Sequence, residues 1–228
     1  LCSFAYDLVI RKRLGGLNMS EFVMLETPLP VHSTRILSLA EKYSTCLSLS
    51  DRVFAKEWLL SLDQRSCNVA WRALWALAPR RRLELLAVFN AIVSRWYSLT
   101  DTDIEKVFEH CDWPLGAETA EFDVKGFWRV DKDELPEQRV TVLTQIAHRN
   151  LGEHLHDCAG ELLSGFESFC SQNSGDGWLL PETLRLADYG LGHDDRAAEY
   201  QPVAAQIGPR FVDWQLCQTV EESWRECH

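Results

Sequence analysis

The sequence predicts a mainly α fold, an irregular multi-helix module with a loop-rich acidic C-terminal region. Apolar residues recur at intervals of three and four along most of the chain, which is the period of a helix with one buried face. Asp, Ser and Thr precede several of these segments, where they can cap helix amino termini. Glycine and proline gather toward the C-terminal end, and residues 190–215 are therefore expected to be rich in loops.

Three helices are expected between residues 33 and 78. The first carries an apolar stripe over residues 36–47, the second follows a capping Asp51 and runs to residue 62, and the third spans residues 69–77 and stops before Pro79. Trp58, Trp71 and Trp75 in these segments, and Trp96 further on, fall in apolar helical patterns. Most tryptophans are therefore expected in the core rather than free to stack on nucleic-acid bases.

A long helix is predicted from Arg80 to Tyr97, followed by a capped helix from Thr100 to Phe108. Three consecutive arginines, at positions 80–82, open the long helix. Cations are unfavourable there because a helix amino terminus carries partial positive charge. A phosphate or an acidic partner would compensate them, as would neighbouring carboxylates, and the sequence leaves these alternatives open.

The second half is expected to alternate helices with loops. The predicted elements are a loop over residues 112–134 with a weak strand at Phe127–Trp128, a helix from Pro136 to about Leu151, a helix from Leu155 to Phe169, a loop over 171–177, a short helix from Pro181 to Tyr189, and a last helix around Glu221–Cys227.

Composition excludes several classes of protein. No run of about 18 apolar residues occurs, so no membrane span is expected. The eight cysteines form no Cys-x-x-Cys pair, and a chain of this size with such cysteines is expected to hold reduced, mostly buried thiols in the cytoplasm.

Charge divides the chain into two unlike halves. Residues 1–100 hold 13 basic and 8 acidic side chains, a net charge of +5, whereas residues 101–228 hold 10 basic and 26 acidic side chains, a net charge of −16. Phosphate would be repelled by the second half, so any DNA contact is expected within residues 1–100. The acidic half either meets a basic partner or is a solvated surface.

The first residues read as a helix that ends in a basic cluster. Phe4 and Leu8 recur at helical spacing behind a capping Ser3, and glycines 15 and 16 end the helix because glycine readily adopts left-handed backbone angles. The last turn holds three cations, Arg11, Lys12 and Arg13. They either interact with the helix dipole or contact phosphate, with the glycine pair allowing the backbone to approach DNA.

This opening resembles a segment that follows the catalytic core of large N6-adenine DNA methyltransferases, the Eco57I-like enzymes of restriction-modification and phage defence. The matching residues are Ser3, Asp7, Arg11, Gly15, Gly16, Phe22, Pro28 and Pro30. The stretch Arg82–Thr100 resembles a recurring scaffold helix of the same family, with Asn90 where aspartate is usual. The chain, which opens at Leu1 and has its first methionine at Met19, is therefore expected to be the C-terminal part of such a protein.

The resemblance implies that three segments of the chain have different roles. Residues 1–30 would end a target-recognition-like segment, 31–111 would form a helical module, and 112–228 would be an acidic helical and loop-rich region. The residues expected to bind DNA are Arg11, Lys12, Arg13, Gly15, Gly16, Asn18 and Ser20. The expected function is non-catalytic DNA positioning or target recognition, and the alternative is a protein–protein interaction or scaffold module without DNA contact.

Catalysis and its cofactor are expected upstream of this chain. An N6-adenine methyltransferase needs an Asn/Asp-Pro-Pro-Tyr/Phe loop for the flipped adenine, and none occurs here. The chain alone is expected not to bind S-adenosylmethionine, which would belong to the upstream core.

Two further clusters carry residue types used in catalysis or metal binding. His154, His156, Asp157 and Cys158 include metal-ligand types, but His156 would point away from a helix face shared by 154 and 158, so a metal site is not expected. A second cluster combines Asp188 with residues 193–195. It lacks a nucleophile, and we expect it to hold the C-terminal tail by hydrogen bonds.

Overall fold

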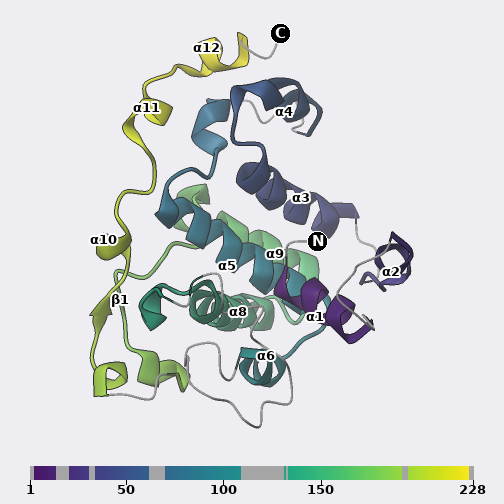
Figure 1. Ribbon diagram of the computed structural model, residues 1–228, viewed down its shortest axis with the longest axis vertical. Helices are drawn as coiled ribbons and strands as arrows, with labels where there is room; N and C mark the ends of the chain where they lie inside the picture. The colour runs from purple at the N-terminus through teal and green to yellow at the C-terminus, as the bar shows by residue number, and fades with distance from the viewer. Residues whose placement is uncertain are drawn as a thin grey trace.

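The computed structural model confirms a mainly α fold (Figure 1). It describes residues 3–13, 21–30, 34–61, 70–108, 131, 133–191 and 195–225, without the side chains of Lys12, Leu59 and Ser61. The α-helices are α1 (Phe4–Arg13), α2 (Glu21–Glu26), α3 (Thr34–Ser48), α4 (Ala55–Ser61), α5 (Pro79–Trp96), α6 (Asp101–Phe108), α8 (Val140–Asp157), α9 (Leu162–Ser171), α10 (Ala204–Ile207), α11 (Asp213–Leu216) and α12 (Val220–Arg225).

Short 3₁₀ turns and one small strand pair complete the described elements. The 3₁₀ turns are η1 (Arg52–Phe54), η3 (Trp71–Leu74), η4 (Pro136–Gln138), η5 (Asn173–Gly175), η6 (Leu186–Tyr189) and η7 (Asp195–Ala198). Strands β1 (Thr183–Leu184) and β2 (Gln201–Pro202) pair antiparallel, with Thr183 opposite Pro202. None of the described helices combines the length and the apolar character needed to cross a membrane.

Helices α5 and α8 form the centre of the molecule and pack along each other. Both helices bury small and aliphatic side chains, with Ala87, Ala91 and Ile92 on α5 and Leu143 and Ala147 on α8 fully buried. Helix α3 lies against α5, and α9 lies against α8 (Figure 1). Because one hydrophobic cluster runs from Ala5 to Ala204, the basic first half and the acidic second half share a single core.

Helix α6 carries a second, smaller cluster that positions α1. Ile104, Val107 and Phe108 are buried there, and Phe4 of α1 packs edge to face on Phe108 with ring centroids 5.0 Å apart. Such aromatic pairs add about 0.5–1.5 kcal/mol beyond the area they bury. The cluster therefore fixes the orientation of α1 relative to the central helices.

Two predicted helix starts are confirmed. Asp51 caps η1, with its carboxylate 2.9 Å from the Val53 amide, and η1 leads directly into α4. Thr100 and Asp103 cap α6 reciprocally, because Thr100 donates to the Asp103 carboxylate and accepts from the Asp103 amide. Hydrogen bonds from Thr100 hold the pKa of Asp103 below its ordinary value.

The predicted helix over residues 69–77 is wrong. Only the turn η3 forms there, and Pro79 begins α5 instead of ending a helix. The Ala76 amide donates to the Cys46 carbonyl at 2.9 Å, and the Ala76 carbonyl accepts from Arg82 at 2.9 Å. These long-range bonds satisfy backbone groups that a helix would otherwise have paired.

The helices predicted around residues 136–169 have different boundaries. The residues from Pro136 form the separate turn η4, since Arg139 is extended, and α8 runs on to Asp157. Leu155 consequently belongs to α8 and not to the next helix. Ala159 and Gly160, both at positive φ, reverse the chain before α9. Gly152, a residue type common just after a helix end, follows Leu151 but lies inside α8.

The short helix predicted from Pro181 to Tyr189 is also wrong, because β1 and η6 occupy this stretch. The last helix is confirmed as α12, within the described residues. The predicted strand at Phe127–Trp128 and most of the 112–134 loop lie outside the described residues. The described cysteines are free thiols, of which Cys46 is buried and Cys217 is exposed, so the expectation of mostly buried thiols holds only for part of them.

Candidate functional site

Contacts from the core hold α1 at its amino-terminal end. The Phe4 amide donates to Asn90 Oδ1 of α5 at 2.7 Å, and Ser3 Oγ accepts from the Tyr6 amide at 3.2 Å. Ala5, Tyr6 and Ile10 are buried. Asn90, expected to be scaffold, is thus a cap for another helix, a role that a single sequence gives no means of predicting.

The predicted cations lie at the other end of α1. Arg11 pairs with Asp7 one turn earlier at 2.8 Å, and the Arg13 guanidinium donates to the Glu26 carbonyl at 2.6 Å and to the Glu26 carboxylate at 3.3 Å. These ion pairs are half-exposed, and such pairs contribute about 0–1 kcal/mol each. Lys12 is on α1, but its side chain is outside the described residues, as are Gly15, Gly16, Asn18 and Ser20 entirely.

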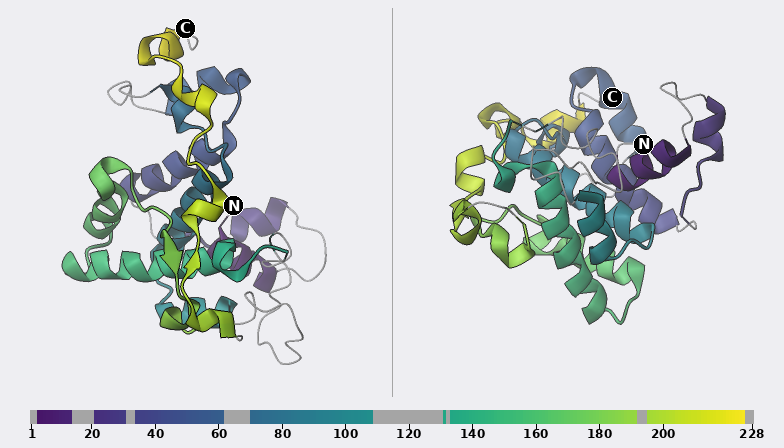
Figure 2. Two further views of the ribbon diagram at one scale, coloured as in Figure 1. Left: turned by 90° about the vertical axis from the view of Figure 1, so that its left-hand side faces the viewer. Right: turned by 60° about the horizontal axis from the view of Figure 1, so that its bottom comes forward.

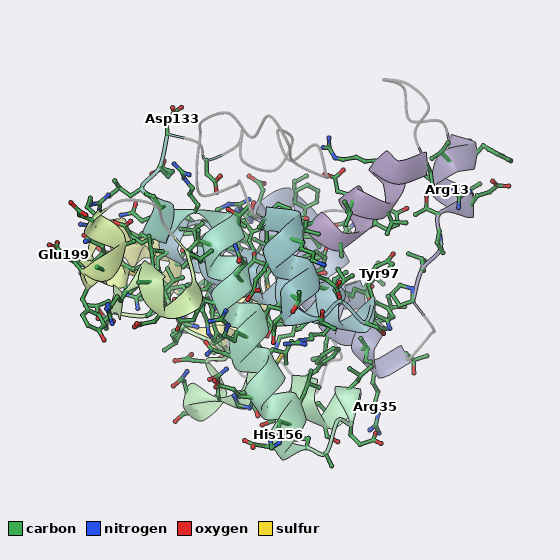
Figure 3. All side chains as sticks on the ribbon, turned by 90° about the horizontal axis from the view of Figure 1, so that it is seen from below. Arg13, Arg35, Tyr97, Asp133, His156 and Glu199 are labelled. Carbon is green, nitrogen blue, oxygen red and sulfur yellow. The ribbon has the colours of Figure 1, made fainter. Side chains whose placement is uncertain are left out.

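Arg13 belongs to a set of donors that fasten the C-terminal end of α2. Tyr6 of α1 donates to the Met24 carbonyl at 3.5 Å, and Tyr97 at the end of α5 donates to the Pro28 carbonyl at 2.9 Å. Helix carbonyls at this end have no partner within the helix, so outside donors stabilise them. Arg13 also places a cation at the negative end of α2. Figure 3 shows Arg13 and Tyr97 on the side of the molecule that carries α2.

The side chains of α2 are presented to solvent although its backbone is held. None of its residues is buried. Phe22 is 66% exposed, Leu25 is 78% exposed, and Leu29 just beyond the helix is 61% exposed. Phe22 and Leu25 are three residues apart and therefore share one face of the helix. The segment thus displays apolar side chains on a backbone fixed by polar contacts.

The arginines that open α5 are compensated within the chain. Glu84 is fully buried one turn later and accepts from Arg80 and Arg81 at 3.3 Å each and from Arg210 at 2.9 Å. Arg82 donates to main-chain carbonyls. Among the alternatives left open by the sequence, neighbouring carboxylates are the ones that the structure contains, so these arginines do not point to a phosphate.

A polar cluster joins α5, α6 and α8. Asp101 Oδ1 lies 2.6 Å from an Arg95 nitrogen and 2.7 Å from Nδ1 of the buried His148, and Arg95 also donates to the His148 carbonyl at 3.0 Å. Gly152 makes room for this arrangement, since a Cβ there would lie 2.5 Å from the Arg95 guanidinium. Burial lowers the pKa of His148 to about 4, with a further contribution from the Arg95 charge, although Asp101 opposes the shift.

A surface pocket of about 460 Å³ opens beside this cluster. Arg95, Asp101, Arg149 and residues of the last turns of α8 line it, and none of these described lining residues is a Ser, Thr, Cys or Lys nucleophile. The neutral His148 donates to the carboxylate of Asp101, an arrangement that orients the two side chains. The cluster therefore serves to tie three helices together.

Acidification is expected to destabilise the protein through His148. Its pKa is about 4 when folded and about 6.5 when unfolded, so the unfolded chain binds the proton first as pH falls. The contribution of His148 to the free energy of unfolding is therefore complete above about pH 6.5 and is lost as the pH falls toward 4. The loss amounts to about 3 kcal/mol. Urea titrations at about pH 7 and 4.5 should show this loss in the wild type and a much smaller one in His148→Asn, which retains a neutral donor.

His156→Asn is the matched control for that measurement, because His156 is 93% exposed at the far end of α8 (Figure 3). The free energy of unfolding of this variant should equal that of the wild type at both pH values. If His148→Asn lost as much unfolding free energy between the two pH values as the wild type does, the assignment of the pH dependence to His148 would be contradicted.

The residues considered for metal binding are not brought together. His154 Nδ1 lies 2.9 Å from Ser168 of α9, and His156 Nδ1 lies 3.8 Å from Asp157. Over the part of the chain that the structure describes, no group of three or more His, Cys, Asp or Glu side chains could hold a metal ion. Asp188 pairs with Arg185, three residues earlier in the same turn, at 2.9 Å. Residues 193 and 194 lie outside the described residues, so the expected anchoring of the tail stays a prediction.

Of the seven tryptophans among the described residues, four are buried, namely Trp58, Trp71, Trp75 and Trp178. Trp96, expected in the core, is half-buried, and Trp214 in the C-terminal tail is 48% exposed. Comparisons of the chain with protein-family models, with curated proteins and with solved structures find no match.

Proposed function

We propose that this chain is a non-catalytic helical module that docks onto a protein surface through Phe22, Leu25 and Leu29, here called the α2 surface. The partner that we propose is the catalytic core of the larger adenine-specific DNA methyltransferase-like protein implied by the resemblance of residues 1–30. In this proposal the core binds S-adenosylmethionine, and the assembly works in the cytoplasm.

The exposure of these three side chains on an anchored backbone is the observation that carries the proposal. Apolar side chains grouped on a protein surface are typical of protein interaction sites. The hydrogen bonds from Arg13 and Tyr97 hold the α2 backbone in place before any partner binds. Because the α2 backbone is already ordered, it loses little conformational entropy when a partner binds, which favours binding.

The test begins with the reading frame upstream of Leu1, where an Asn-Pro-Pro-Tyr-type motif should be found. That upstream portion is then expressed separately and titrated with this chain in a calorimeter. Phe22→Ser combined with Leu25→Ser should weaken binding at least about tenfold, because central apolar anchors carry about 1–2 kcal/mol or more each in an interface.

A matched control uses two apolar side chains that are equally exposed elsewhere. Val53 and Leu60 are 74% and 87% exposed on η1 and α4, so Val53→Ser with Leu60→Ser removes the same kind of surface. Binding by this control should equal that of the wild type. Unchanged binding by the α2 variant, or equal loss in both pairs, would refute the α2 surface as the docking site.

DNA positioning is the second function that we propose, through the end of α1 and the glycine-containing stretch after it. The observation in its favour is that Arg11 and Lys12 lie at the α1 terminus beside α2, and the Arg11–Asp7 pair is half-exposed and therefore easily exchanged for phosphate. Gly15, Gly16, Asn18 and Ser20 would follow the DNA backbone, as the resemblance implies.

Fluorescence anisotropy with duplex DNA at several salt concentrations tests this second function. Arg11→Ala with Lys12→Ala should weaken binding and flatten the salt dependence by up to about 0.9 per lost phosphate contact. Arg13 is left intact because it fastens α2. Arg35→Ala with Arg52→Ala, two exposed cations on other elements, is the control. Identical affinity and salt slope in the α1 variant would leave helix stabilisation as the role of these cations.

A further inference from the structure

Residues 205–225, here called the strap, run along the outside of the helical core. Beginning within α10, the strap passes through α11 to α12 and reaches the end of the molecule that holds α4 and η3 (Figures 1 and 2). Its helices span only four to six residues, which is too short for a helix to be stable without outside contacts. What holds the strap must therefore come from the core.

The strap buries almost no apolar side chain. Within it only Gln215 and Ser223 are buried, and both are polar. Ile207 and Trp224 pack on the core in part. In α5 and α8, by contrast, whole helix faces of aliphatic residues are removed from water. Apolar burial is the main source of folding stability, so the strap is held far more weakly than the central helices.

An ionic contact fixes the middle of the strap. Arg210 donates to the buried Glu84 at 2.9 Å and to the Asp176 carbonyl at 2.8 Å, and it pairs with the Asp176 carboxylate at 3.0 Å. Glu84 also accepts from arginines of α5. The carboxylate therefore keeps cationic partners when the strap leaves, which lowers the free energy needed to release Arg210.

Three neutral hydrogen bonds, made by two strap residues, fix the remainder of the strap to η3 and to Trp75 just after it. Gln215 donates to the carbonyls of Arg72 and Trp75 at 2.8 and 3.0 Å, and the Trp71 amide donates to Ser223 Oγ at 2.7 Å. Neutral hydrogen bonds contribute modestly because water replaces them on release.

The strap covers aromatic residues of the core. Trp214 packs edge to face on Trp75 with ring centroids 5.9 Å apart, and Trp75 packs in the same way on Trp71 at 4.7 Å. Trp71 and Trp75 are buried with the strap in place. Its departure would give water or another molecule access to this pair.

We infer that residues 205–225 form a releasable strap, a lid over Trp71 and Trp75 that opens as a unit while α5, α8 and α9 stay folded. Arg210 is its latch, and Gln215 and Ser223 are its secondary anchors. The device lies apart from the α2 surface and does not depend on the function proposed for that surface.

Hydrogen exchange of the whole chain, read by mass spectrometry, tests the strap. In the wild type, the amides of the strap, residues 205–225 without Pro209, should exchange at least about tenfold faster than those of α5 and α8, because local opening precedes global unfolding. Arg210→Ala should accelerate exchange about a further tenfold in the strap and at Trp71–Leu74, with no change in α5 and α8. Arg225→Ala is the control inside the strap, since Arg225 is exposed and pairs only weakly, at 3.4 Å, with Glu221.

A second variant keeps the test decisive if Arg210→Ala disturbs the buried Glu84. Gln215→Leu removes the side-chain amide that donates to the Arg72 and Trp75 carbonyls and leaves the ionic contact of Arg210 intact. It should accelerate hydrogen exchange in the strap to a similar extent. The proposal is overturned if the wild-type strap exchanges in step with α5 and α8. It is equally overturned if both variants leave strap exchange unchanged, or if both accelerate exchange across the central helices to the same extent.

Discussion

Residues 101–228, expressed without residues 1–100, are expected not to fold into a stable domain, although the helical pattern of this half alone predicts that they would. Leu143, Ile146 and Leu151 of α8 are buried, and α8 packs more extensively on α5 of the missing half than on any other described element. Exposing a fully buried aliphatic side chain costs about 1.5–3 kcal/mol. Three such residues amount to about 4.5–9 kcal/mol, which is comparable with the whole stability of a domain, about 5–15 kcal/mol.

Circular dichroism and thermal melting of the separate half check this expectation. The fragment should show reduced helicity and no cooperative transition, whereas the full chain should melt cooperatively. Adding separately expressed residues 1–100 should restore helicity, because the α5–α8 contact is re-formed. A cooperative transition in the fragment alone would contradict the single shared core.

Glu84→Ala is expected to be the most damaging single substitution, with a loss of about 3–5 kcal/mol in the free energy of unfolding. Its carboxylate is fully buried and faces Arg80, Arg81 and Arg210 at 2.9–3.3 Å. Removing it leaves three guanidinium groups close together at the positive end of α5, without the charge that compensates them. Glu84→Gln should lose less, since an amide oxygen still accepts hydrogen bonds.

Urea denaturation followed at the helical signal measures these differences, since urea leaves the ion pairs unscreened. Glu182→Ala is the control, because Glu182 contacts Arg80 at 3.6 Å but is 75% exposed. Such a surface pair should change stability by no more than about 0.5 kcal/mol. A loss in Glu84→Ala no larger than in Glu182→Ala would show that the cluster contributes little.

Local signals in the sequence predicted the helices that carry a regular apolar face. The starts of η1 and α6 were predictable because Asp51, Thr100 and Asp103 bond to backbone amides only two or three residues away. The position of Arg11, Lys12 and Arg13 in the last turn of α1 was predictable in the same way. Interactions within one helical turn need no knowledge of the rest of the chain.

Elements held by distant residues could not be predicted in this way. The stretch before α5 resembles a helix in its apolar spacing, but its backbone bonds to Cys46 and Arg82. The segment after Pro181 is a strand because Gln201–Pro202 pairs with it. The exposure of the α2 side chains was not predicted either, because it depends on the contacts that Tyr6, Arg13 and Tyr97 make with the backbone of residues 24–28.

The sequence by itself determined that this protein is mainly α, where its longest helices lie, and that its charge is divided between two halves. Those properties follow from composition and from contacts within a turn or two of helix. Only the tertiary structure decided that both halves share one core, that Glu84 compensates the arginines of α5, and that the strap is held by polar anchors. These depend on pairs such as Glu84 and Arg210, 126 residues apart, whose proximity exists only once the chain has folded.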